Sequence, residues 1–467
     1  MKFLSLGNKQ LLLLIISGAL SGCAGDSSRL PTETLKLEVA LPTSWKAAQL
    51  SGTESGEVSD GWLKELQSPQ LEKLVTEAFG HNHDLQIVAL KWKNARETAV
   101  ITSTDLHPTV DGGISSKRTR SISSTDTAST INRHQLELSA VWEVDLWKRL
   151  SDQQRAAVTR EEAAAIDLKA AKLSLAAEVA RSWYAAIESK QQVRLARRRL
   201  TADIEALGVI EERYHNGLVD ALDLHLARSE VATTEERLTS KEMEQTRLLR
   251  QLETLLGRYP ATELMVAEQL PEINNPIPAG LPSALLERRP DIAASNKRMV
   301  AAELDAEVAA RNRLPSFSLT ARGGTSSLEL HSLLDWDYLI WSLLGNLTQP
   351  LFQQEKLKAE EMLEKIGHQE AWIAHAQTIL IAFREVEDAL AADHYHQLRV
   401  ASLARATNES HQAAILALGR YQNGLIDILA LLDAKQRAYD HESNRLQAVA
   451  DRIDNRIVLH LALGGSF

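Results

Sequence analysis

An eight-residue motif that occurs twice constrains the fold of this chain more than any other feature. The sequence reads RYHNGLVD over residues 213–220 and RYQNGLID over residues 420–427. The two copies are 207 residues apart (420 − 213 = 207). The same offset separates Gly217 and Gly424 within the motif and two pairs outside it, Asp84 and Asp291, and Pro108 and Pro315. Several landmarks at one offset indicate a structural repeat, so we predict one body built from two copies of a unit.

The N-terminal residues are typical of an exported bacterial lipoprotein. Lys2 and Lys9 precede an apolar run from Leu11 to Ile16, which is too short for a membrane-spanning helix. The residues Leu-Ser-Gly-Cys then lead to Cys23, the only cysteine, and resemble a lipobox. We predict that residues 1–22 are a signal peptide and that Cys23 carries a covalent lipid such as palmitate. Ala24 favours retention at the outer membrane; an ordinary signal peptide with an incidental cysteine is the alternative.

The composition argues against several functional classes. The formal net charge of −10 disfavours nucleic-acid binding, which requires a basic face. A single cysteine allows no disulfide within the chain. No nucleotide-binding, nucleophile-elbow or metalloprotease motif is present, and His81 and His83, like His394 and His396, are spaced too closely to share a helix face. We therefore predict no enzymatic activity, no metal site and no cofactor beyond the lipid.

Two regions of the sequence alternate apolar and polar residues, as membrane-spanning β-strands do. Residues 136–146 and 316–322 follow this period of two, residues 341–347 follow it more weakly, and residues 109–120 hold the expected partner strand. A soluble hairpin is the alternative interpretation. Four strands cannot close a barrel, and open sheet edges are not tolerated in lipid, so several chains must share one barrel. The polar side places Glu137, Glu143 and Asp145 toward a cation-favouring lumen.

Very long helices follow each pair of strands. No Gly or Pro occurs over residues 148–207, which at 1.5 Å per residue corresponds to about 90 Å of helix. Residues 218–256, 351–418 and 425–463 are similar, and Gly367, inside 351–418, is the one glycine or proline in these runs. Helices of this length need neighbours along their length, so we predict a packed layer of helices. Residues 24–61, rich in Ser, Thr, Pro and Gly, are predicted to form an extended tether.

The repeated motif is predicted to form the turn between two long helices. Gly217 suits the left-handed conformation that ends a helix, and Asp220 suits the cap of the next helix, as Gly424 and Asp427 do in the second copy. Ala430 stands where a second acid would support the first turn of that helix. Two apolar residues follow each glycine, and exposed apolar residues at an apex often mark a docking surface. The alternative is that the motif forms only a turn.

At this point the sequence resembles a known family, the outer-membrane efflux proteins, which are TolC-like exit ducts, and most closely its lipid-anchored branch. The matching stretches are the lipobox at Cys23, VWEVDLWKRL from Val141, RYHNGLVDALDLHLAR from Arg213, LLERRPDIAAS from Leu285, LPSFSLTARGG from Leu314, LTQPLFQQEKLKAE from Leu347 and RYQNGLIDILALLDAKQ from Arg420. They cover nearly the whole predicted mature chain. The resemblance implies a homotrimer in which each chain gives four strands to a 12-stranded β-barrel, continued by a periplasmic α-helical barrel.

The resemblance also implies a function and partners. The chain would be the passive outer-membrane channel of a tripartite efflux system that conducts drugs or other toxic small molecules. Its partners would be a periplasmic adaptor protein, an inner-membrane pump, often of the proton-driven RND type, and outer-membrane lipid. A duct for a type I protein secretion system and a structural envelope lipoprotein without a channel are the alternative functions.

Two sets of residues are assigned roles on this basis. The adaptor-docking residues are Tyr214, Gly217, Leu218, Val219, Tyr421, Gly424, Leu425 and Ile426. The residues that we expect to hold the tube shut by ion pairs are Arg213, Asp223, Arg420, Asp427 and Asp433. The predicted domains are the signal peptide 1–22, a lipid-tethered segment 23–68, a first repeat 69–270 with strands near 107–146, a second repeat 271–463 with strands near 314–351, and a tail 464–467.

Overall fold

The computed structural model describes residues 42–51, 61–66, 68–122, 126, 128–272 and 280–465. All of these belong to one compact unit, Leu41–Phe467, and the description below concerns that unit alone. The predicted signal peptide, Cys23 and most of the predicted tether lie outside the described residues. Among the described helices, none carries an apolar stretch long enough to cross a bilayer.

The two repeats contain the same succession of helices and strands. The first holds α4 (Pro69–His81), α5 (His83–Thr104), α6 (Arg149–His215) and α7 (Ala221–Leu255). The second holds α8 (Pro282–Arg288), α9 (Pro290–Arg311), α10 (Gln354–Gln422) and α11 (Ile428–Ala462). α6 and α10 have 67 and 69 residues, or about 100 Å each, and continue past the glycines at 208, 367 and 419. Tertiary packing along these helices outweighs the modest cost of a glycine in a helix.

The strands form one antiparallel sheet in the order β1-β2-β3-β4, in which the first repeat supplies β1 (Thr109–Ile122) and β2 (Ala128–Glu143). The second supplies β3 (Ser316–Ser327) and β4 (Leu339–Thr348), joined through the 3₁₀ turns η1 (Leu330–Ser332) and η2 (Trp336–Tyr338). Half of the polar stretch 121–130 between β1 and β2 belongs to the strands, because Ser121 pairs with Ser129, Ile122 with Ala128, and Thr130 with Arg120. β1 and β4 leave two open edges.

The register assigns each side chain to one of two faces, since directly opposite residues point the same way. Leu138 of β2 pairs with Gly112 and with Gly323, and Gly323 pairs with Trp341. Counting in steps of two from this row gives one predominantly apolar face, with Val110, Ile114, Leu136, Ala140, Trp142, Phe317, Leu319, Ala321, Leu343 and Leu347. The other face holds Asp111, Glu137, Ser139, Glu143, Ser318, Thr320, Arg322, Ser342 and Asn346. We call these the apolar face and the polar face of the sheet.

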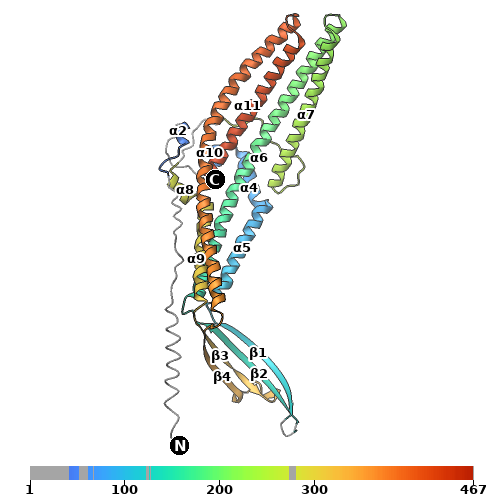
Figure 1. Ribbon diagram of the computed structural model, residues 1–467. Coiled ribbons are helices and arrows are strands. Elements are labelled where there is room, and N and C mark those ends of the chain that lie inside the picture. The colour runs from blue at the N-terminus through green and yellow to red at the C-terminus, as the bar shows by residue number, and fades with distance from the viewer. Residues whose placement is uncertain are drawn as a thin grey trace. The chain divides into compact units, whose positions relative to one another are not determined.

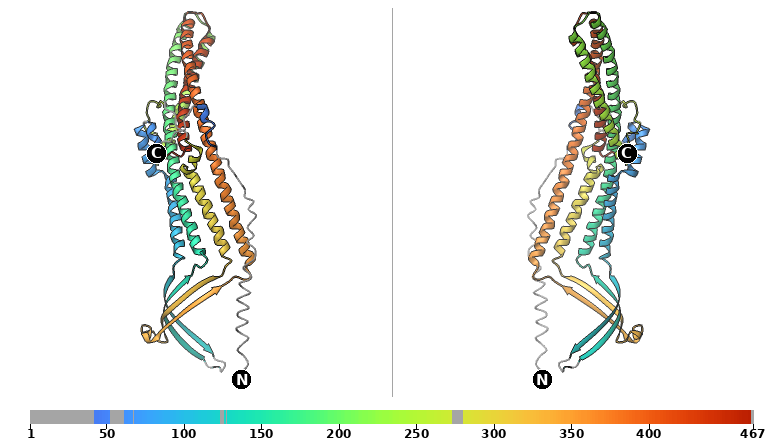
Figure 2. Two further views of the ribbon diagram at one scale, coloured as in Figure 1. Left: turned by 90° about the vertical axis from the view of Figure 1, so that its left-hand side faces the viewer. Right: turned by 90° about the vertical axis from the view of Figure 1, so that its right-hand side faces the viewer.

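The long helices lie side by side as a curved layer. Nearest the strands, α5 packs on α6, α6 on α9, and α9 on α10 (Figure 2). Farther from the strands, α6 pairs with α7 and with α11, and α10 pairs with α11. The α6–α7 and α10–α11 turns lie at the opposite end of the unit from the strands (Figure 1). The main core lies between these ends, where Trp62, Trp183, Leu252 and Ile457 are fully buried.

Part of the predicted tether is described, and it is not simply extended. Residues Ala48–Ser51 form the short helix α2, and Trp62–Glu65 form α3. The Glu387 carboxylate on α10 accepts hydrogen bonds from the backbone nitrogens of Lys46 and Ala47 at 2.9 and 2.8 Å. The side chains of Trp45 and Trp62 are buried. Buried tryptophans and these backbone contacts hold the segment against the helical layer, which periodicity in so short a stretch did not indicate.

Candidate functional site

The two repeated motifs form nearly identical turns, which we call the first tip (residues 213–220) and the second tip (residues 420–427). Gly217 has φ 72° and Gly424 has φ 73°, the left-handed region that non-glycine residues avoid. The Leu218 nitrogen donates to Arg213 O at 2.9 Å and the Gly217 nitrogen to Tyr214 O at 2.9 Å. The same pair of bonds recurs in the second tip. These are the bonds of a Schellman motif, which satisfies the last carbonyls of a helix.

Aspartates cap the helices that leave each tip. The Asp220 side chain accepts a hydrogen bond from the Asp223 nitrogen at 3.1 Å, and the Asp427 side chain accepts one from the Ala430 nitrogen at 2.8 Å. A carboxylate in this position satisfies an otherwise unpaired backbone N–H and interacts favourably with the helix dipole. The cap needs only the backbone of the fourth residue, so Ala430 serves as well as Asp223.

Apolar residues are exposed at both apices. Leu218 is 65% exposed and Leu425 is 72% exposed. Val219 and Ile426 are half-buried instead, because they pack on a small core of Ile210, Ala227, Tyr421, Ile428 and Leu431 that joins the two tips. The predicted docking set therefore divides into residues available to a partner and residues that support the turn.

The two tyrosines of the repeat differ in their surroundings. Tyr214 is 39% exposed, whereas Tyr421 is 4% exposed and lies against Arg213 of the first tip. The Tyr421 hydroxyl donates a long hydrogen bond, 3.5 Å, to the Asp223 carboxylate. Burial and this carboxylate raise the pKa of Tyr421, while burial and the charges of Asp220 and Asp427 raise the pKa of Asp223. The sequence motif alone treats the two tyrosines as equivalent.

Five residues are predicted to hold the tube shut. Two of them, Arg213 and Asp223 of the first hairpin, contact the second tip. Arg213 donates to the Gln422 carbonyl at 2.6 Å, and Asp223 faces Tyr421. Asp433 pairs with Arg437 one helical turn away at 2.9 Å, and both side chains are exposed. The Asp427 carboxylate caps α11. The Arg420 side chain is exposed and forms no hydrogen bond or ion pair with the described residues.

A buried ionic cluster, which sequence reasoning missed, lies farther down the same helices. The Arg199 guanidinium donates to Asp203 at 2.5 Å, to Glu230 at 2.7 Å and to the Lys435 carbonyl at 2.7 Å. The Asp203 carboxylate also accepts hydrogen bonds from the Lys435 ammonium at 2.6 Å and from the Thr234 hydroxyl at 3.0 Å. The cluster joins α6, α7 and α11. Its only sequence signal is the i,i+4 spacing of Arg199 and Asp203, which most helices contain.

The three acids predicted to face the lumen each have a close partner. Glu137 lies 3.7 Å from Arg322 across the polar face, and Glu143 lies 2.7 Å from Arg149. The Asp145 carboxylate accepts hydrogen bonds from the first turn of α6, from the nitrogens of Leu150 and Ser151. The arginines and the backbone N–H groups reduce the negative potential that unpaired carboxylates would create in the lumen.

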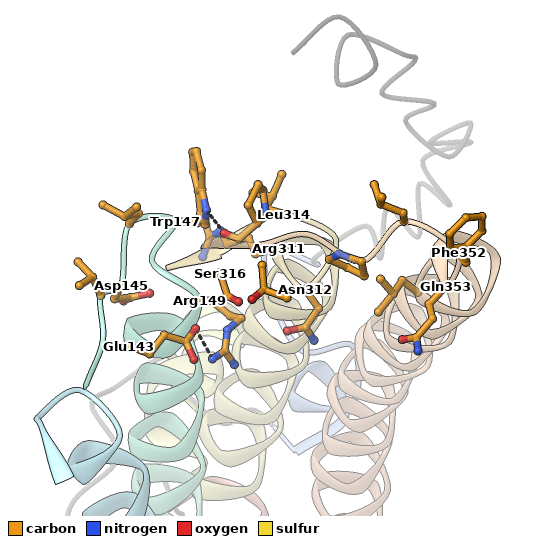
Figure 3. A pocket seen from close by; sticks show the side chains of 17 residues that line it. Glu143, Asp145, Trp147, Arg149, Arg311, Asn312, Leu314, Ser316, Phe352 and Gln353 are labelled. Atoms are coloured by element: carbon orange, nitrogen blue, oxygen red, sulfur yellow. Dashed lines mark hydrogen bonds and ion pairs between the residues drawn. The ribbon is translucent and has the colours of Figure 1, made fainter. Parts of the chain in front are cut away.

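Two of these acids border a hollow of about 650 Å³ where the strands meet the helices (Figure 3). Glu143 and Arg149 form their ion pair within it, and the Trp147 indole nitrogen donates to the Pro315 carbonyl at 2.7 Å. Phe352 stands fully exposed at the same level. The hollow thus combines one ion pair with exposed aromatic side chains.

Comparison with known proteins places this geometry in a family. The family model described as Outer membrane efflux protein matches twice, over residues 74–258 and 281–465, and the matches begin 207 residues apart (281 − 74 = 207). The pyoverdine export outer membrane protein OpmQ of Pseudomonas putida is 28% identical over 98% of each chain. The outer membrane protein OprJ of Pseudomonas aeruginosa is 30% identical over 97% of this chain and 95% of its own.

Solved structures agree with the sequence comparison. The outer-membrane channel OprN superposes with a TM-score of 0.86 at 26% identity and covers 92% of this chain and 97% of its own. CusC, a transmembrane channel, gives a TM-score of 0.82 at 25% identity over 91% and 98%. These likenesses confirm the predicted fold class: two repeats, mainly helical, with four strands per chain for a trimeric transmembrane β-barrel. The chain belongs to the outer membrane efflux protein family, whose members are channels and not enzymes.

Proposed function

We propose that this chain forms the homotrimeric exit duct of a tripartite efflux system and passively conducts small toxic molecules across the periplasm and the outer membrane. The observation that carries the proposal is the open sheet, β1-β2-β3-β4, with one apolar face and two unpaired edges. Unpaired backbone groups are not tolerated in hydrocarbon. Joining β4 of one protomer to β1 of the next in a ring of three satisfies every edge and places the polar face around a lumen.

The tips are the proposed docking surface for a periplasmic adaptor protein. Leu218 and Leu425 are the anchors because they are the most exposed apolar residues of the two turns, while Gly217 and Gly424 set the turn geometry. Val219, Ile426 and Tyr421 support the anchors from below, and Tyr214 lies beside them. An aspartate at either leucine position adds an unpaired charge to an interface that would bury it, which strongly disfavours association.

The gate is proposed to be held by the contact between the two tips. Arg213, Tyr421 and Asp223 connect the α6–α7 hairpin to the α10–α11 hairpin, so separating the hairpins requires breaking these contacts. Arg420, Asp427 and Asp433 would contribute through a neighbouring protomer. Each exposed interaction is worth about 0–1 kcal/mol, and a threefold arrangement multiplies it.

The lipid anchor and the pump complete the proposal. Acylation of Cys23 would add to the hold of the barrel in the outer membrane. An inner-membrane efflux pump is proposed to drive export, because the relatives that this chain matches along nearly their whole length include an efflux pump protein named for toluene and a cation efflux protein. We propose the RND type for this pump on the sequence resemblance alone. Those names describe the relatives' cargo; for this chain we propose the broader class of toxic small molecules. A type I secretion duct and a channel-free structural lipoprotein are the alternatives.

The proposal is tested in a Gram-negative strain that lacks its own outer-membrane factor and carries the adjacent pump and adaptor genes. Export of a fluorescent dye should require this chain, and the purified protein should form a trimer that conducts in planar bilayers. L218D/L425D should abolish export while trimers and conductance persist. M265D is the control, because Met265 is 86% exposed in a loop far from the tips. A non-conducting protein contradicts the duct; a conducting trimer that exports a polypeptide and no dye favours the secretion alternative.

A further inference from the structure

The apolar face of the sheet carries two arginines beyond Ile114, and Ile122 follows them at the end of β1. Arg118 lies opposite Asn132 and Arg120 lies opposite Thr130 in the β1–β2 register. Both positions are an even number of residues from Ile114, so both side chains belong to the apolar face. Both are exposed. A charged pair on the lipid-facing side of a membrane sheet needs a physical explanation.

The height of the apolar rows places the arginines at a membrane surface. The rows extend from Phe317, beside Val144, to Leu136, opposite Ile114, which is eight residues along β2 (144 − 136 = 8). At about 3.4 Å per residue this is about 27 Å of strand, and a typical tilt reduces it to a height close to the apolar band of outer-membrane barrels. Arg118 and Arg120 are four and six residues beyond Ile114 (118 − 114 = 4; 120 − 114 = 6), on the side away from the helices.

The two arginines have no counter-charge among the residues that the structure describes. Neither guanidinium forms a hydrogen bond or ion pair with the part of the chain that the structure describes. Between residues 112 and 136 the sequence contains a single acid, Asp126, and it lies in the turn beyond them. Since the helices extend into the periplasm, this end of the hairpin reaches the outer leaflet, where the headgroups of the membrane glycolipid carry phosphates.

We propose that Arg118 and Arg120 bind the phosphate groups of the outer-leaflet glycolipid, lipopolysaccharide. Two side chains on one face of a strand, two residues apart, are about 7 Å from each other at the backbone, close enough to reach one headgroup. A guanidinium forms two parallel hydrogen bonds to a phosphate, and it is more weakly hydrated than an ammonium, which suits a site at the edge of hydrocarbon. The site fixes the depth of the barrel and adds an anionic lipid to its outer surface.

The same hairpin supplies a matched control. Lys117 and Arg133 are directly opposite one another and belong to the polar face, at the same height as Arg118 within one residue. They carry the same formal charge as Arg118 and Arg120 but point toward the lumen. A variant on that face therefore changes the charge of the hairpin equally without touching the lipid-facing site.

The experiment uses the full-length purified trimer and native mass spectrometry with added lipid A. Wild type should retain bisphosphorylated lipid A better than dephosphorylated lipid A or phosphatidylethanolamine. R118Q/R120Q should lower retention of the bisphosphorylated form by about tenfold. R118K/R120K should recover part of it, and K117Q/R133Q should retain it like wild type.

Three results overturn the proposal. One is equal retention by R118Q/R120Q and wild type. Another is an equal loss in K117Q/R133Q, because this indicates a general effect of charge. The third is retention that does not depend on the phosphates. If R118Q/R120Q fails to form trimers, two variants that keep the total charge are compared, R118K/R120K and K117R. R118K/R120K should lose the bidentate contacts and retain less lipid A than K117R. Equal retention by these two variants contradicts the proposal.

Discussion

The guanidinium of Arg213 in the first tip donates a 2.6 Å hydrogen bond to the Gln422 carbonyl of the second tip, and its central carbon lies 5.4 Å from the Tyr421 ring centroid. The repeat partner of Arg213 is Arg420, which has no such contact with the described residues. One arginine of the pair therefore joins the two hairpins, although the sequence motif is the same in both.

This asymmetry predicts different effects of the two arginines on the gate. Arg213→Ala removes the hydrogen bond to Gln422 and the contact with the Tyr421 ring, and should raise the mean single-channel conductance in planar bilayers. Arg420→Ala is the matched comparison and should raise conductance less, because the Arg420 side chain has no contact with the described residues of its own protomer and would act only through a neighbouring one. The loss of several interactions of about 1 kcal/mol per trimer is enough to shift a closed state that is only slightly favoured. Equal conductance of both variants, or a larger effect of Arg420→Ala, contradicts this assignment.

The tip glycines should be more sensitive to substitution than the helical glycines near them. An added Cβ at Gly217 or Gly424 meets nothing within 4 Å, so any cost arises from the backbone alone. Gly217→Ala and Gly424→Ala should each destabilise the hairpin by about 1 kcal/mol because of their left-handed φ. Gly419→Ala, inside α10, is the control and should be neutral or stabilising. Hydrogen exchange of the tip amides measures the difference, and equal protection in the three variants would refute it.

Removing the acid at the centre of the buried cluster should be costly. Asp203 is 3% exposed and contacts Arg199, Lys435 and Thr234, so Asp203→Ala removes the carboxylate partner of Lys435 and leaves the buried Arg199 with Glu230 as its carboxylate partner. A loss of about 3–5 kcal/mol in the free energy of unfolding is expected. Glu242→Ala breaks the exposed pair with Arg197 and should cost at most about 1 kcal/mol. Urea unfolding followed by circular dichroism compares the two, and similar midpoints contradict the role of the cluster.

His460 should make stability depend on pH. Burial lowers the pKa of His460 from 6.5 to about 4, and Glu65, 3.2 Å away, opposes this only in part. The folded state therefore binds fewer protons than the unfolded state between pH 4 and 6.5, so stability falls as the pH decreases through this window. The full effect is about 3 kcal/mol.

The thermal midpoint of the trimer at pH 7 and pH 4.5 measures this dependence. It should fall more in wild type than in His460→Gln, which cannot take up the proton. Equal falls in both proteins would show that other groups cause the loss. The comparison between proteins at each pH removes the contribution of the remaining acids.

The ion selectivity of the lumen should depend on the pair formed by Glu137 and Arg322 rather than on Glu137 alone. Glu137 lies 3.7 Å from Arg322 on the polar face, so Glu137→Gln leaves Arg322 without its neighbouring carboxylate. The reversal potential in a KCl gradient should then shift toward anion preference. E137Q/R322Q should restore a value near wild type, because it removes both charges. A double variant that stays as anion-preferring as the single one contradicts the pairing.

The sequence specified the features that depend on local chemistry. The offset between repeats, the period of two in Leu136, Leu138 and Trp142, and the long stretches without proline each reflect backbone geometry, which is the same wherever the element lies. Gly217 and Asp220 likewise fixed the turn, because a left-handed residue and a side-chain cap act within a few residues. These predictions needed no knowledge of distant contacts.

Only the tertiary structure decided which of these residues meet. Tyr214 and Tyr421 occupy the same position in the repeated motif, yet one is exposed and the other is buried beside Arg213, because only the second packs between two hairpins. Arg199 and Lys435 are separated by 236 residues (435 − 199 = 236) and share Asp203 only after α6 and α11 pack together. Burial and long-range pairing depend on how helices from the two repeats are placed, and a periodic pattern contains no information about that placement.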